Sequence, residues 1–175
     1  VNSNKLQHLD LSNASKLEKI YVSSNGLESL ELPESLPNLL EINVNSNKLK
    51  KLDLNNSTKL QKLYANGSNN HALESIVLPE SLPDLIEIDL SSNSLTQQLN
   101  LNSATKLQKI NVSNNKLKGL ILPSVAKDLV EMKISSNELE SLKLPTEIPK
   151  LTTIDVHNNK LQQLDLSNYN NIISV

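Results

Sequence analysis

One apolar pattern restarts at nearly constant intervals along the chain. In single letters it reads LxxIxVxxNxLxxLxL, and its first complete copy runs from Leu17 to Leu32. The later copies begin 22, 21, 25, 22, 22 and 22 residues apart, at Leu39, Leu60, Leu85, Leu107, Leu129 and Leu151. A fixed interval of this length indicates a solenoid, in which each turn packs only on its neighbours. We therefore expect residues 1–175 to form a single domain of about eight turns of 21–25 residues.

Each turn contains two short extended segments. In the first, such as Leu17 to Val22, apolar and polar residues alternate with the period of a β-strand. A second apolar pair follows, such as Leu30 and Leu32, and about a dozen residues per half-turn leave no room for a long helix. This spacing is that of leucine-rich repeats. The predicted fold is an α/β-type solenoid dominated by β. It is a right-handed superhelix with a parallel sheet on the concave face, short extended or 3-10 segments on the convex face, and little or no α-helix.

The corners that lead into the first segment are of two kinds. Polar corners occupy 12–16, 55–59 and 102–106, and proline-containing corners occupy 33–38, 79–84 and 145–150. The two kinds alternate until Leu122, where Pro123 and Pro145 fall in successive turns. The repeating unit is therefore a doublet of about 43–44 residues. One turn carries a three-residue insertion within 66–72, and insertions in repeats form loops that can be functional.

An asparagine recurs once per turn. Its amide is expected to bind the backbone of its own turn and of the next turn, which makes it a structural ladder. The members are Asn4, Asn25, Asn47, Asn93, Asn115, Asn137 and Asn159, with Asn69 expected from the inserted turn.

Outward-pointing residues of the sheet form columns. The first column alternates in charge, as Lys19, Glu41, Lys62, Glu87, Lys109, Glu131 and Thr153, and predicts attraction between neighbouring strands. The second column is irregular, as a recognition surface can be, and its two tyrosines favour protein binding. A third column, of mostly small polar residues, ends with His157. The candidate partner-binding residues are the second column and this histidine: Tyr21, Asn43, Tyr64, Asp89, Asn111, Lys133, Asp155 and His157.

The sequence lacks the residues that several classes of function require. The net charge is −2 and all 17 basic residues are Lys, which disfavours nucleic acid binding. No apolar run is long enough to insert into a membrane, and no Cys is present. The three His share no column, and we find no catalytic, metal-binding or phosphate-binding motif. We predict a protein that is not an enzyme and needs no cofactor or metal.

The turns resemble those of bacterial leucine-rich repeat proteins. The segment Leu6 to Asn25 resembles repeats of internalin-like surface proteins, although it has no Cys in the strand. The segment Leu27 to Asn47 is similar to repeats of secreted effectors, some of which carry a ubiquitin-ligase domain. The resemblance implies a virulence-type recognition module, secreted or on the surface of a bacterium, that binds a protein ligand by its concave face. The alternatives are a structural stalk or spacer of an adhesin, and the substrate-recognition arm of a secreted effector ubiquitin ligase.

The pattern begins and stops within a strand. Val1 matches Val22, and Ile172 and Val175 match Leu17 and Ile20. Solenoids need polar caps on their terminal turns. We therefore expect a piece of a longer chain, whose uncapped ends pair with another copy or with flanking segments.

Overall fold

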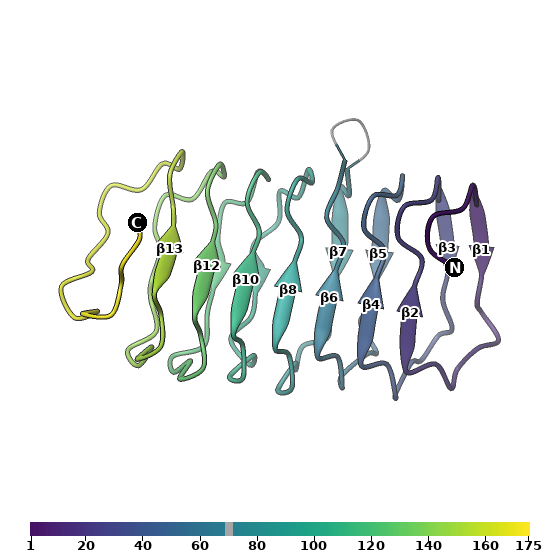
Figure 1. Ribbon diagram of the computed structural model, residues 1–175, viewed down its shortest axis with the longest axis horizontal. Helices are drawn as coiled ribbons and strands as arrows, with labels where there is room; N and C mark the ends of the chain where they lie inside the picture. Colours follow the sequence, from purple (N-terminus) through teal and green to yellow (C-terminus); the bar gives the residue numbers. More distant parts are fainter. Residues whose placement is uncertain (69–71) are drawn as a thin grey trace.

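The computed structural model shows a solenoid whose turns stack along one axis (Figure 1). It describes residues 1–68 and 72–175. One strand per turn enters a seven-stranded parallel sheet, and none of the described residues is helical, as predicted. The strands, in order across the sheet, are β2 (Lys19–Tyr21), β4 (Glu41–Asn43), β6 (Lys62–Tyr64), β8 (Glu87–Asp89), β10 (Lys109–Asn111), β12 (Glu131–Lys133) and β13 (Thr153–Asp155).

The opposite side of the solenoid carries shorter pairings. Its strands are β1 (His8–Asp10), β3 (Ser29–Glu31), β5 (Lys51–Asp53), β7 (Ser75–Val77), β9 (Leu99–Asn100) and β11 (Leu120–Ile121). They form three separate two-stranded sheets, β1–β3, β5–β7 and β9–β11. Each pair joins a turn with a polar corner to the following turn with a proline corner, so the doublet read from the sequence is also the unit of hydrogen bonding on this side.

Strand pairing on this side stops between β3 and β5 and between β7 and β9, whereas beyond β11 the corner amides of Thr146 and Ala126 still donate to the carbonyls of Ser124 and Glu147. Within doublets, the Leu11 amide donates to the Glu31 carbonyl and the Leu54 amide to the Val77 carbonyl, both at 2.8 Å. The corresponding amides of Leu32 and Leu78 have no such partner among the described residues. Grooves of about 240 and 260 Å³ lie at these two boundaries, between the β3 and β5 turns and between the β7 and β9 turns.

Side chains bridge the boundaries instead. The Asn56 amide donates to the Glu34 carbonyl at 2.8 Å across the first boundary. At the second, the Leu82 amide donates to the Ser103 hydroxyl at 2.9 Å, and the Gln97 side chain donates to the Ile76 carbonyl at 2.5 Å. The doublets are therefore held together here by side chains rather than by strand pairing.

The core consists of inward-pointing leucine and isoleucine side chains, which form one layer in each turn and stack along the solenoid axis. Leu39, Leu60, Ile42 and Leu63 are 0% exposed, and the equivalent positions of later turns are equally buried. Burying such a side chain stabilises the fold by roughly 1.5–3 kcal/mol. The stacked layers of buried aliphatic side chains thus explain how a chain with only 37% hydrophobic residues folds.

The polar corners begin with a local side-chain turn. The Asp10 carboxylate accepts from the Ser12 amide at 2.8 Å, and Asp53 accepts from the Asn55 amide at 3.0 Å. Such bonds are typical of Asp and Asn in turns. The hydrogen bonds from Ser12 hold the pKa of Asp10 below its ordinary value. The recurrent aspartates of this side therefore shape corners.

Candidate interaction surface

The repeated asparagines form a ladder beside the sheet. Asn115 donates to the Leu90 carbonyl at 2.9 Å and to the Val112 carbonyl at 3.1 Å, and it accepts from the Leu95 amide at 3.1 Å. Leu90 and Leu95 belong to the preceding turn, whereas the sequence analysis expected contacts with the next one. The four central members are 7–8% exposed: Asn47, Asn93, Asn115 and Asn137.

The ladder loosens towards the ends of the chain. Asn25 and Asn159 are partly exposed and Asn4 is exposed, although all three keep amide-to-carbonyl bonds. The expected member of the inserted turn, Asn69, lies outside the described residues, as do residues 70 and 71 of the loop expected over 66–72.

The residue before each described ladder asparagine is in the left-handed region. Its φ lies between 53° and 58° at Ser3, Ser24, Ser46, Ser92, Asn114, Ser136 and Asn158. This conformation reverses the chain at the end of the strand, so that the following asparagine points inwards. Left-handed backbone costs an L-residue about 1–2 kcal/mol, so the ladder bonds offset a local strain in these seven turns.

The strand register aligns the two outward columns as the sequence indicated. Lys19, Glu41 and Lys62 are direct neighbours, and so are Tyr21, Asn43 and Tyr64. However, among the described residues no lysine of the first column lies within 4.0 Å of a glutamate on a neighbouring strand. The expected charge ladder is thus present in register but without close ion pairs.

The tyrosine hydroxyls of the second column interact with glutamate carboxylates of the first column. The Tyr64 hydroxyl donates to the Glu87 carboxylate at 2.8 Å. Partial burial and the neighbouring Glu87 raise the pKa of Tyr64 well above its ordinary value. Hydrogen bonding to Glu41 raises the pKa of Tyr21, whose side chain is 38% exposed. Both tyrosines therefore remain neutral donors, each directed at the carboxylate of the next strand.

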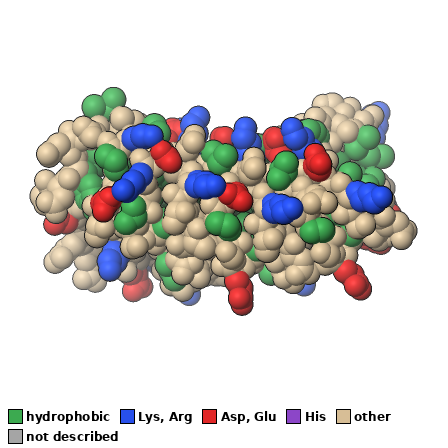
Figure 2. Space-filling view, turned by 90° about the horizontal axis from the view of Figure 1, so that it is seen from below, with side chains coloured by type: hydrophobic (Ala, Val, Ile, Leu, Met, Phe, Trp, Pro, Cys, Tyr) green, Lys and Arg blue, Asp and Glu red, His purple; other side chains and the backbone are tan. Residues whose placement is uncertain are grey.

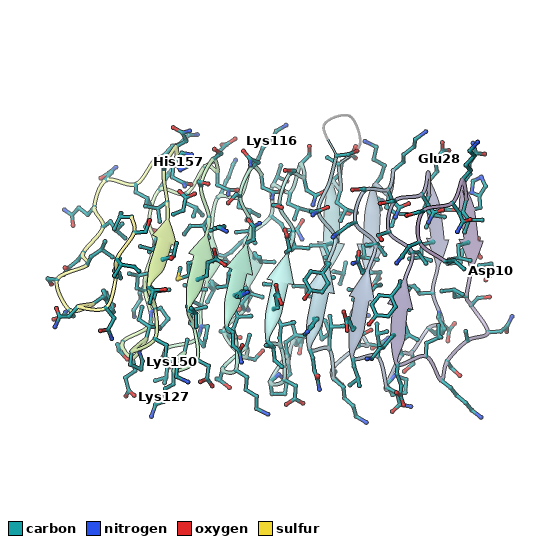
Figure 3. The ribbon with its side chains drawn as sticks, viewed as in Figure 1. Asp10, Glu28, Lys116, Lys127, Lys150 and His157 are labelled. Carbon is teal, nitrogen blue, oxygen red and sulfur yellow. The ribbon has the colours of Figure 1, made fainter. Side chains whose placement is uncertain are left out.

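In the C-terminal half the charges of this face pair with one another. Lys133 Nζ lies 2.6 Å from Glu131 of the same strand, and this bond raises the pKa of Lys133. His157 Nδ1 lies 2.5 Å from Asp155. Burial alone raises the pKa of Asp155, but hydrogen bonds from His157 and Ser135 outweigh it and the pKa is lowered. Figure 3 shows His157 at one edge of the sheet, opposite the edge of Lys127 and Lys150.

Close ion pairs between turns occur at the corners instead, which the sequence analysis missed. Lys106 binds Asp84 at 2.7 Å and Lys150 binds Asp128 at 2.6 Å, in each case one turn back along the chain. Neighbouring blue and red side chains mark this edge of the molecule in Figure 2. The 22-residue spacing of these pairs is visible in the sequence and was the available signal.

The described residues contain no group of three or more His, Cys, Asp or Glu side chains arranged to hold a metal ion. No helix in the same residues is long and apolar enough to cross a membrane.

A family model places these turns among known repeats. Residues 2–131 match the model described as Zer-1-like, leucine-rich repeats. The chain belongs to the leucine-rich repeat family. Among solved structures, it is similar to one described as the functional domain of InlJ from Listeria monocytogenes, which includes a cysteine ladder. The TM-score is 0.81 and the identity 29%, over 97% of this chain and 36% of that chain. This chain has no cysteine. No curated protein matches it.

This leucine-rich repeat chain therefore spans about a third of the internalin chain that it matches. The internalin-like architecture implies a role in protein interaction in general terms. It leaves the ligand open.

Proposed function

We propose that this leucine-rich repeat domain binds a protein ligand through the outward face of the seven-stranded sheet. The observation that carries the proposal is the second column. Its register places Tyr21, Asn43 and Tyr64 side by side on three adjacent strands, with Asp89 on the fourth. Partly exposed tyrosines on a rigid support are typical of binding hot spots. The remaining proposed contacts are Asn111, Lys133, Asp155 and His157.

The rigidity of the face supports this role. Each of the five inner strands is held on both sides by neighbouring strands, and the ladder asparagines fix the loops beside them. Small residues such as Asn45 and Ser91 follow the strands and leave room for a partner. Binding to such a preformed surface loses little conformational entropy.

We further propose that the protein is secreted or displayed on the surface of a bacterium. The support is its similarity to the functional domain of InlJ, a protein of Listeria monocytogenes. On this view the ligand is a protein of a host or neighbouring cell.

The test compares two turn-matched positions. A photo-crosslinking p-benzoylphenylalanine is placed at Asn111 on the sheet face or at exposed Asn100 on the opposite side, and each protein is irradiated on intact animal or bacterial cells. We expect one discrete adduct from position 111 and none from position 100. Unlabelled protein should compete for it, and protein carrying Tyr21→Ala and Tyr64→Ala should not.

Other results have distinct meanings. An equal adduct from position 100, or competition by the double tyrosine variant, would show that the sheet face is not the binding surface. Absence of any adduct with cells of either kind would favour the spacer over the recognition module.

A further inference from the structure

The N-terminal half of the sheet face combines aromatic rings with carboxylates. We call Tyr21, Glu41, Tyr64, Glu87 and Asp89 the tyrosine patch; they lie on the adjacent strands β2, β4, β6 and β8. Tyr64 is anchored by its backbone on β6 and by its hydroxyl on Glu87 of β8. Its ring therefore lies across the sheet with its hydroxyl already occupied, and what it offers a ligand is a π face.

A π face attracts cations, because the ring carries negative charge above and below its plane. The surroundings of Tyr64 add to this preference. Glu87, Glu41 and Asp89 are the charged groups that raise the pKa of Tyr64. None of the three forms an ion pair within 4.0 Å in the part of the chain that the structure describes.

The position of Asp89 distinguishes the patch from the rest of the face. The neighbours of Asp89 in the second column are Tyr64 and Asn111, both uncharged. The two lysines of these four strands, Lys19 and Lys62, belong to the first column. In the C-terminal half, by contrast, the corresponding Asp155 is already paired with His157. Among the described residues, Asp89 thus has no cationic group within 4.0 Å.

We propose that the protein ligand presents a lysine or arginine side chain to the tyrosine patch, where its stem lies against the Tyr64 ring and its cationic head pairs with Asp89. The inference rests on the proposed use of the sheet face and specifies the chemistry of the partner. It separates this ligand from an acidic or purely apolar one, which would desolvate the negative charges of Asp89 and Glu87 without supplying a cation.

The substitutions that test it are conservative by the evidence of the chain itself. Asp89 accepts from the Ser91 amide at 2.9 Å. Asn43 and Asn111, at the equivalent position of other strands, accept the same local bond at 3.1 and 3.3 Å. Asp89→Asn therefore removes the charge and keeps the local bond. Asp53→Asn is the matched control, because Asp53 accepts the same kind of local bond from the Asn55 amide at 3.0 Å and lies on β5, on the opposite side of the solenoid.

The probes are three acetylated and amidated pentapeptides, Gly-Ser-X-Ser-Gly, in which X is arginine, norleucine or glutamate. Each is titrated into the isotope-labelled protein, with the Tyr64 ring and Asp89 carboxylate signals followed by NMR. The arginine peptide should shift these signals most, and added salt should weaken its binding. We expect Asp89→Asn and Tyr64→Ala each to weaken it about three-fold, and Asp53→Asn to leave it unchanged.

Three results would overturn the inference: norleucine binding as tightly as arginine, Asp53→Asn acting like Asp89→Asn, or no shift at the patch with any peptide. The first leaves the sheet face standing as a binding surface, since the norleucine peptide would still occupy it. The proposed function itself is tested separately, by the crosslinking results at positions 111 and 100.

Discussion

Replacing Asn115 by alanine tests how much of the stability resides in the asparagine ladder. Two carbonyls that Asn115 contacts have a second donor: Leu90 also accepts from Asn93 at 2.9 Å, and Val112 from Asn137 at 2.9 Å. The Leu95 amide has Asn115 as its partner, at 3.1 Å. A third and longer bond, to the Ser113 carbonyl at 3.4 Å, is also lost, but Ser113 still accepts from the Ser92 amide at 2.9 Å. The substitution therefore leaves one buried N–H group unsatisfied and removes three further hydrogen bonds, of which the third is weak.

The magnitude follows from this count. A buried donor without a partner costs about 1–3 kcal/mol, and each lost bond to a still-satisfied carbonyl about 0.5–1.5 kcal/mol. We expect a destabilisation of about 3 kcal/mol, which for a domain of this size lowers the melting temperature by roughly 6–12 °C. Thermal and urea denaturation followed by circular dichroism measure it.

The control is Asn102→Ala, because Asn102 is exposed and its side chain makes no hydrogen bond in the described part of the chain. Its stability should stay within about 0.5 kcal/mol of the parent protein. The Leu95 amide should also exchange with solvent faster in Asn115→Ala alone. If Asn115→Ala and Asn102→Ala have the same melting temperature and urea midpoint, the asparagine ladder does not contribute this stability.

Three further predictions concern the backbone. A Cβ on Gly67 would lie 1.9 Å from the Ser92 carbonyl oxygen, so Gly67→Ala should destabilise the fold by at least about 1–3 kcal/mol. The control is Gly26→Ala, which should fold normally because the nearest atom to its Cβ lies at 3.6 Å. Urea denaturation of the two variants measures the difference. Ser46→Gly should stabilise by up to about 1 kcal/mol, because φ is 55° there, and an unchanged urea midpoint would contradict that strain. In hydrogen exchange the Leu11 amide should be protected and the Leu32 amide should not, and equal rates would show that the doublet boundary is closed in solution.

The repeat predicted the sheet face well. Equal intervals between parallel strands permit one register that stacks the apolar residues, so the alignment of Tyr21 with Asn43 followed from counting. The corners were equally readable as two alternating kinds, and the doublet that they indicated is also the unit of strand pairing on the opposite side, which the sequence alone did not predict.

Side-chain contacts between columns were not readable in this way. The bond from Tyr64 to Glu87 runs diagonally and depends on torsion angles that spacing does not fix. The left-handed residue before each asparagine was also missed, since serine is not the residue usually associated with that conformation. The partner-binding role of the second column stays a prediction.

The alternating strand pairs on the opposite side also bear on how such a chain changes in length over generations. Gain or loss of a whole doublet leaves every pair with its complement, whereas gain or loss of one turn puts two corners of the same kind in succession. The chain carries such a junction at Pro123 and Pro145. Beyond it, no two-stranded pair forms on the opposite side of the described turns, and β11 is the last strand there. The doublet is therefore the unit whose gain or loss preserves this strand pairing. The C-terminal turns show the structure that results when two corners of the same kind follow each other.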